Sequence, residues 1–337
     1  MTLLRSWWVR AGLVVLLAAA VWQAAVANRW SRRLVAGWSW AAVQIGTFTR
    51  PDPETNRLGE RETPALYERR LEVMGPGNAP NTVILEERFT VWDVDGTVRW
   101  QALTQSSVDP RTGLHAEGDH QGQAAVFPRR VHQTTYRFHA GHLNSIPLAF
   151  QREEAIEGLP TYLFAYKGRA EYTGVYTGTD DFIPSHGSPA EERESPKGDS
   201  PKPGALARGA GFTGIAVKSW QEIRCADDQF AIQVWVEPLT GEVVKLDERC
   251  PSGDYVYETT TDLPVFPVAR WGGVTAGDEV LARVSALQRL RRRHAWETRA
   301  VPWGLWLGGV GLIGIGLLVG SGWVRWLPRP AASAGAP

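Results

Sequence analysis

The residues best suited to catalysis or metal binding are few, and they lie in loops. His115, Asp119 and His120 fall together in a glycine-rich stretch, and His139 and His142 form an H-x-x-H pair. A zinc site needs three or four converging ligands with supporting hydrogen bonds. Polar loop residues are therefore the stronger interpretation of both groups, and no metal is expected.

Three carboxylates, Glu153, Glu154 and Glu157, are spaced closely enough for acid–base chemistry. They precede an expected strand in a charged turn, which favours a solvated face. The chain contains no G-x-S-x-G, P-loop or H-E-x-x-H motif. We therefore predict a protein that is not an enzyme and binds no cofactor.

Two cysteines, Cys225 and Cys250, flank a predicted hairpin whose turn lies at 237–241. Folding this hairpin is expected to bring both thiols to its open end, within reach of a disulfide. A disulfide there would indicate an oxidising compartment. The alternative is two unrelated buried thiols.

Two hydrophobic segments, Ala11–Ala27 and Trp303–Val324, must position everything else. The second has 22 residues without a charge, enough to cross a bilayer core of about 30 Å. The first is expected to be an uncleaved helix, although the sequence at 25–27 also resembles a signal-peptidase site. The stretch 34–48 is either an interfacial helix or the first core element of the central domain.

Aromatic and small residues support these membrane segments. Indole rings favour the headgroup zone, and the tryptophans at the segment ends are Trp7, Trp8, Trp30, Trp296, Trp303, Trp306, Trp323 and Trp326. Glycines let membrane helices approach closely. Two G-x-x-x-G pairs predict helix packing through Gly304, Gly308, Gly316 and Gly320.

The side of the membrane is indicated by two conflicting signals. Arginines flank the apolar segments mainly toward the central region, which by the positive-inside rule favours the cytoplasm. That rule weakens for long translocated loops, and the cysteine pair favours an oxidising compartment. We therefore expect an extracytoplasmic domain on a bacterial inner (cytoplasmic) membrane.

The central region is predicted to be a mainly β, bent antiparallel sheet, either a half-barrel or a sandwich, because short alternating runs are separated by turn signals. Net charge is zero, so nucleic acid is not an expected partner. The expected organisation is 1–33 as transmembrane helix or signal anchor, 34–273 as β-rich domain with a Pro-rich loop at 179–211, 274–301 as amphipathic juxtamembrane helix, 302–326 as transmembrane helix and 327–337 as tail.

Three short motifs carry a resemblance to a known family. They are Val108–Gly113 (VDPRTG), Glu157–Phe164 (EGLPTYLF) and Trp235–Val244 (WVEPLTGEVV). The chain resembles an uncharacterised, mainly actinobacterial family of membrane-anchored proteins labelled "PorA-like porin". The resemblance implies an N-terminal hydrophobic segment, an exported β-rich domain and a C-terminal helix, and no established active site. The cysteine pair and the Pro-rich insertion depart from it.

These observations predict a non-catalytic structural or interaction subunit that stabilises a membrane protein complex, for example an energy-transducing assembly. Its expected partners are membrane lipid and other membrane or periplasmic proteins. The alternative is a module of the cell envelope that binds a lipid or another apolar ligand. A porin in the literal sense would need a closed barrel or several helices around a channel.

Overall fold

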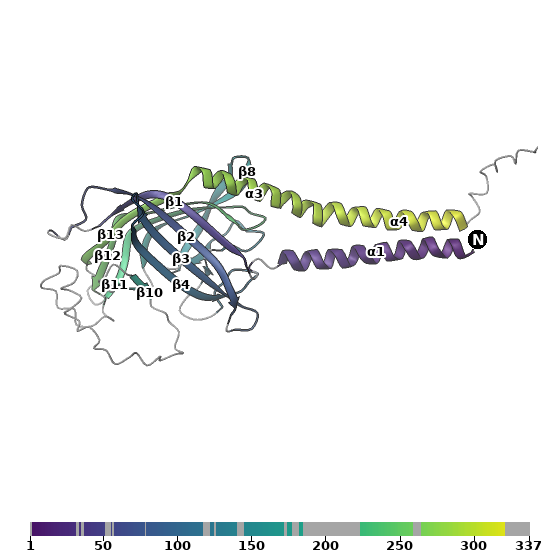
Figure 1. Cartoon of the computed structure of the whole chain (residues 1–337), viewed down its shortest axis with the longest axis horizontal. Helices are drawn as coiled ribbons and strands as arrows, with labels where there is room; N and C mark the ends of the chain where they lie inside the picture. The colour runs from purple at the N-terminus through teal and green to yellow at the C-terminus, as the bar shows by residue number, and fades with distance from the viewer. Residues whose placement is uncertain are drawn as a thin grey trace, which may run out of the picture. The chain divides into compact units, whose positions relative to one another are not determined.

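The computed structural model describes residues 2–320 except 32–33, 35–36, 51–54, 56, 78, 117–121, 125, 140–144, 172–173, 177–181, 185–222 and 259–263. The chain divides into two compact units. One comprises Met1–Ser31 and Arg289–Pro337 and is called the helical unit; the other, Arg32–Gln288, is called the sheet unit (Figure 1).

The helical unit contains two long apolar helices, α1 (Thr2–Ser31) and α4 (Val301–Gly320). Helix α3 (Gly277–Ala295) begins in the sheet unit and is followed by a short π-helix, η2 (Trp296–Ala300), and then by α4. Two helical stretches, Trp7–Trp30 and one within Gly277–Val319, are long and apolar enough to cross a membrane. The protein is thus suited to membrane association.

The sheet unit is built on one large sheet with the strand order β4-β3-β2-β1-β13-β12-β11-β8-β7-β6-β5. Its strands are β1 (Ser39–Thr49), β2 (Thr63–Pro76), β3 (Val83–Asp93), β4 (Val98–Val108), β5 (Gln123–Ala124), β6 (Tyr136–His139), β7 (Ile146–Ile156), β8 (Leu159–Glu171), β11 (Ile223–Val236), β12 (Val243–Glu258) and β13 (Pro264–Thr275). A separate ribbon pairs β9 (Gly174–Tyr176) with β10 (Phe182–Pro184).

The sheet is antiparallel except at the β5–β6 pair, and it is not closed into a barrel. The predicted mainly β, antiparallel fold is therefore confirmed, as one curved sheet rather than two packed sheets (Figure 1). The apolar stretch 34–48 contributes strand β1, which begins at Ser39. Most of the predicted Pro-rich loop, 179–211, lies outside the described residues.

The three family motifs form tight turns. In the turn before β12, the Glu237 carboxylate accepts hydrogen bonds from the backbone N–H (2.6 Å) and hydroxyl (2.7 Å) of Thr240, and Gly241 has φ 72°. After β4, Asp109 caps its own turn by accepting from the N–H of Arg111 at 2.6 Å. The β7–β8 turn places Glu157 at φ 48° beside a glycine. These sequences fold locally because carboxylates and glycine favour such turns.

The core is formed by the alternate side chains of each strand that lie on the inner face of the sheet. Strand β2 alternates so that Ala65, Tyr67, Arg69, Leu71 and Val73 are all buried. Aromatic rings from distant strands meet there, as in the contact of Tyr67 with Trp271, whose ring centroids lie 5.9 Å apart. Each fully buried large side chain contributes about 1.5–3 kcal/mol. Of these five buried positions in β2, Arg69 is the charged one.

The first and last strands of the large sheet in sequence are hydrogen-bonded neighbours. Strand β1 pairs with β13, with Gly46 opposite Gly273. A Cβ at Gly46 would lie 1.7 Å from the carbonyl oxygen of Gly272, so this close approach requires glycine. At the end of this pair, Arg283 of α3 donates to the Val243 carbonyl at 2.9 Å and so holds the start of the helix on the sheet.

Candidate functional site

The helical unit has a single acidic side chain, Glu297, located in η2. Its carboxylate accepts hydrogen bonds from the Arg293 guanidinium at 2.7 Å and from the Trp30 indole N–H at 2.9 Å. The guanidinium of Arg29 lies 3.6 Å from the same carboxylate. Charge-assisted hydrogen bonds of this kind are roughly twice as strong as neutral ones. We call these four residues the anchor cluster; they join α1 to the start of the C-terminal helix.

The π-helix explains a second link between the same helices. The Val301 N–H donates to the Trp296 carbonyl, so it does not serve the Glu297 carbonyl as it would in an α-helix. The next N–H along the chain would belong to Pro302, which has none. The indole N–H of Trp22 on α1 donates to the Glu297 carbonyl instead, at 3.2 Å. The π-helix and the proline thus create an acceptor that α1 satisfies.

Glycines set the spacing of α1 and α4. A Cβ at Gly12 would lie 2.5 Å from the Ile313 side chain and 2.7 Å from the Gly309 carbonyl oxygen. A Cβ at Gly309 would lie 2.7 Å from the Leu16 side chain. Both are contacts that real Cβ atoms do not make, so larger residues would force the helices apart.

The predicted packing glycines divide between two faces of α4. A Cβ at Gly316 would lie 2.9 Å from Trp8, so this residue packs against α1. A Cβ added at Gly304 or Gly308 would meet nothing within 4 Å in the described part of the chain. Gly320 is the last residue of α4. The helix therefore presents one glycine face to α1 and a second glycine face elsewhere.

The predicted interfacial tryptophans occupy varied surroundings. Trp7, Trp296, Trp303 and Trp306 are exposed. Trp8 makes an edge-on contact with Trp7, with centroids 4.8 Å apart. Trp30 belongs to the anchor cluster. Trp323 and Trp326 lie outside the described residues.

A second charged cluster lies within the sheet. The Arg69 guanidinium is 1% exposed and lies 3.1 Å from the Glu87 carboxylate and 3.0 Å from the Glu248 carboxylate. Gln44 donates to Glu248 at 3.3 Å, and the Arg69 guanidinium lies 5.4 Å from the centre of the Phe89 ring. We call Arg69, Glu87 and Glu248 the sheet triad.

The electrostatics of the sheet triad follow from its burial. Burial alone would lower the pKa of Arg69, but the charges of Glu248 and Glu87 outweigh it, and the pKa is raised. The guanidinium therefore stays charged and joins strands β2, β3 and β12. All three side chains are buried, so the ion pairs of the triad hold these strands together within the core.

The predicted disulfide between Cys225 and Cys250 is not supported by the structure. Cys250 is buried and is not disulfide-bonded, and in the strand register Cys225 pairs with Val256, six residues further along β12. At about 3.3 Å per residue this offset far exceeds the Cα separation of at most about 7 Å that a disulfide bridges. The hairpin is centred near 239–240, so two cysteines at unequal distances from the turn cannot face each other.

Instead, the Cys250 thiol is hydrogen-bonded to the buried carboxylate of Asp227. Burial raises the pKa of Asp227, and hydrogen bonds from the Gln229 N–H at 2.5 Å and the Ser252 hydroxyl at 2.9 Å, together with the Cys250 bond, partly oppose this. These bonds lie at the register shift between Ala226 and Ala231 of β11 and hold its irregular backbone.

The histidines singled out in the sequence are only partly described. His115 pairs with Val108 in an isolated bridge, and His139 ends strand β6. Asp119, His120 and His142 lie outside the described residues. Within the described ranges, no group of three or more His, Cys, Asp and Glu residues could hold a metal ion.

The three carboxylates near the β7–β8 turn engage separate neighbours. Glu153 accepts from the Gln133 amide at 2.5 Å, and Glu154 pairs with Arg152 at 3.0 Å. Both pairs are surface contacts, and Glu157 occupies the turn itself. They do not converge on a common point.

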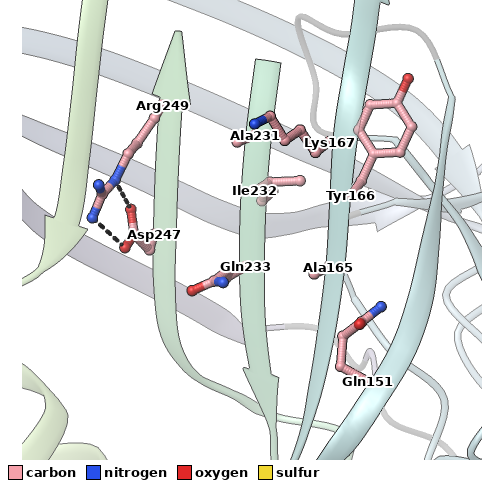
Figure 2. A pocket seen from close by; sticks show the side chains of 9 residues that line it. All are labelled: Gln151, Ala165, Tyr166, Lys167, Ala231, Ile232, Gln233, Asp247 and Arg249. Atoms are coloured by element: carbon pink, nitrogen blue, oxygen red, sulfur yellow. Dashed lines mark hydrogen bonds and ion pairs between the residues drawn. The ribbon is translucent and has the colours of Figure 1, made fainter. Parts of the chain in front are cut away.

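One surface depression crosses neighbouring strands of the sheet, with a volume of about 420 Å³. Figure 2 shows its lining, which comprises Gln151, Ala165, Tyr166, Lys167, Ala231, Ile232, Gln233, Asp247 and Arg249. Its one marked ion pair joins Arg249 to Asp247 at 2.9 Å, and the hydrogen bond to Asp247 raises the pKa of Arg249. With its only carboxylate paired in this way, the depression holds no acid–base dyad.

The sequence reasoning missed both charged clusters. A usable signal for Glu297 was that it is the only acid in an arginine-rich segment and stands five residues before a proline. A usable signal for the sheet triad was a charged residue, Arg69, at a position of an alternating strand where the pattern predicts a buried apolar side chain.

Comparisons with known proteins place the chain in a family. The model of the family Porin PorA matches residues 11–318. The comparison with curated proteins gave no significant match. A solved structure of a Bacteroides fragilis protein with a YmcC-like fold matches 72% of this chain and 97% of its own, at 9% identity and a TM-score of 0.25, too low to carry an argument. The family match covers most of the chain, which therefore belongs to the Porin PorA family.

Proposed function

We propose that this protein is a non-catalytic, membrane-anchored subunit that stabilises a membrane protein complex, with its sheet unit on the extracytoplasmic side of a bacterial inner membrane. The observation that carries the proposal is the second glycine face of α4. A Cβ added at Gly304 or Gly308 would meet nothing within 4 Å in the described chain, whereas a Cβ added at Gly309 or Gly316 would collide with α1. Small residues at membrane-helix surfaces permit close packing of another helix.

The helical unit is suited to such a role because, among the described residues, its own packing leaves Gly304 and Gly308 uncovered. The anchor cluster and the Trp22 bond fix α1 against η2 and α4. Because the two helices are already held together, they lose less conformational freedom on binding than two independent helices would. The proposed partner is therefore a transmembrane helix of another protein.

A pore or an apolar-ligand carrier receives less support. Among the described residues, the large sheet is unclosed: it ends at strands β4 and β5, which the segment between them links only through isolated bridges at Val108–His115 and Leu114–Gln123. Side chains that meet inside it, such as Tyr67, Phe89 and Phe230, are at most 2% exposed. Among the described residues, the inner face is thus occupied by the protein's own core.

The test is purification of the full-length protein in mild detergent, followed by native mass spectrometry. The wild-type protein is expected to carry a second membrane protein. Gly304→Leu/Gly308→Leu should lose that protein while the sheet unit and the helix pair remain folded. The matched control, Gly59→Leu, places the same side chain on the sheet unit, where the nearest atom lies 3.9 Å from an added Cβ, and should keep the partner. A wild-type protein that is always alone would contradict the proposal.

A further inference from the structure

We propose that the segment around η2 binds anionic phospholipid headgroups through arginines that the anchor cluster does not use. The residues are Arg292 and Arg299, with Arg289 acting at longer range. This interaction surface goes beyond the proposed function and does not depend on a protein partner.

The first observation is an excess of positive charge. The helical unit contains six arginines near η2 and the end of α1 and only one carboxylate: Arg29, Arg289, Arg291, Arg292, Arg293 and Arg299 against Glu297. Arg29 and Arg293 already engage that carboxylate. Arg292 and Arg299 are exposed. Their charge therefore remains for an external anion.

The second observation is the position of these arginines relative to the apolar helix. Arg299 stands two residues before α4, about 3 Å along the helix axis, and Arg292 nine residues before it, about 14 Å. The polar layer of a bilayer is roughly 5–8 Å thick on each side. Arg299 thus reaches the phosphates directly, whereas Arg292 lies within one Debye length, about 8 Å, of that layer.

The third observation concerns exposed tryptophans beside these arginines. Trp296 and Trp303, on either side of Arg299, are 62% and 67% exposed. Exposed indoles beside the start of an apolar helix are typical of the headgroup zone. Arg289, Arg292 and Trp296 follow the i, i+3, i+7 spacing of one helix face, so cations and an indole occur together. Cationic side chains with interfacial indoles favour an anionic lipid surface.

The test uses the full-length protein in nanodiscs that contain phosphatidylcholine alone or with phosphatidylglycerol, with retained lipid counted by native mass spectrometry. The wild-type protein should retain phosphatidylglycerol preferentially. Arg292→Gln/Arg299→Gln should reduce that preference about fivefold for each arginine removed. The preference should also weaken as salt is raised.

Matched variants separate charge from folding. Arg70→Gln/Arg88→Gln removes two exposed arginines from the sheet and should leave the lipid preference unchanged. Arg292→Lys/Arg299→Lys keeps the charge and should keep the preference. Equal retention of both lipids by the wild-type protein would overturn the proposal. The proposal would also be overturned if the Arg292→Gln/Arg299→Gln variant kept the lipid preference of the wild type but lost a bound acidic protein.

Discussion

The sheet triad and the anchor cluster have opposite compositions. In the sheet, one guanidinium, that of Arg69, lies between the carboxylates of Glu87 and Glu248. In the helical unit, one carboxylate, that of Glu297, lies between the guanidiniums of Arg29 and Arg293. Each cluster joins segments that are far apart in the sequence.

The difference that matters is exposure. The three side chains of the sheet triad are 0–8% exposed, whereas Arg29 and Arg293 are 59% and 55% exposed. A long exposed arginine can turn its charge toward water when its partner is lost. A buried carboxylate in a packed sheet cannot. The central residue of the sheet triad should therefore be the more costly one to remove.

The largest effect is expected for Arg69→Met. It leaves two carboxylates in the core without their cation, which should lower the free energy of unfolding by about 3–5 kcal/mol. The measurement is denaturant unfolding of the full-length protein in detergent, followed by tryptophan fluorescence. Replacing Glu87 and Glu248 by leucine in the same variant should restore most of the loss.

The control for this change is the adjacent residue, Arg70→Met. Arg70 pairs with Glu68 at 2.8 Å on the exposed face, and its side chain is 54% exposed. A surface pair contributes at most about 1 kcal/mol. Similar losses for Arg69→Met and Arg70→Met would refute the contrast between buried and exposed charge.

A smaller effect is expected for Glu297→Ala. It removes the acceptor of the Arg293 and Trp30 hydrogen bonds, so the helix pair should lose about 1.5–3 kcal/mol. Thermal unfolding in detergent, followed by far-ultraviolet circular dichroism, measures this loss. Glu297→Gln keeps an acceptor for the indole and should lose less; a larger loss for Gln than for Ala would count against the cluster.

A still smaller effect is expected for Trp22→Phe. The Glu297 carbonyl then loses the indole donor, which should cost about 0.5–1.5 kcal/mol in the same thermal assay. The control is Trp303→Phe, which makes the same substitution at an exposed position and should leave helix pairing unchanged. Identical shifts for both variants would show that the Trp22 bond has no specific role.

The smallest effect concerns pH and Asp227. Because burial raises its pKa above the ordinary 3.8, the folded chain binds this proton more tightly than the unfolded chain. Its contribution favours folding at low pH and is lost as pH rises from about 4 through the raised value. The wild type should therefore lose stability relative to Asp227→Asn over that range in denaturant unfolding. A difference that instead grows in favour of the wild type would contradict this.

Much of the fold was predictable because its signals are local. The alternating pattern of 98–108 predicts strand β4 with its observed bounds, and the turns at Asp109 and Glu237 follow from side chains that cap their own backbone. The large apolar segments likewise predict α1 and α4, because length and hydrophobicity suffice.

The charged clusters and the surroundings of Cys250 were not predictable because they depend on strand register. Arg69 meets Glu248 only because β2 and β12 curve toward each other, and Cys250 misses Cys225 because the hairpin centre is offset from the midpoint of the pair. Gly12 and Gly309 were missed as contact residues because a G-x-x-x-G pattern does not state which glycine face meets the partner helix.

The pairing of β1 with β13 has a mechanical consequence. The strand that follows α1 and the strand that precedes α3 are antiparallel neighbours, with Gln44 opposite Thr275. The segment that leads from α1 into β1 and the segment that leads from β13 into α3 therefore join the sheet at neighbouring strands and at the same end of them. A pull through both of them moves β1 and β13 together, and the load passes as shear to β2 and β12 instead of peeling an edge strand away.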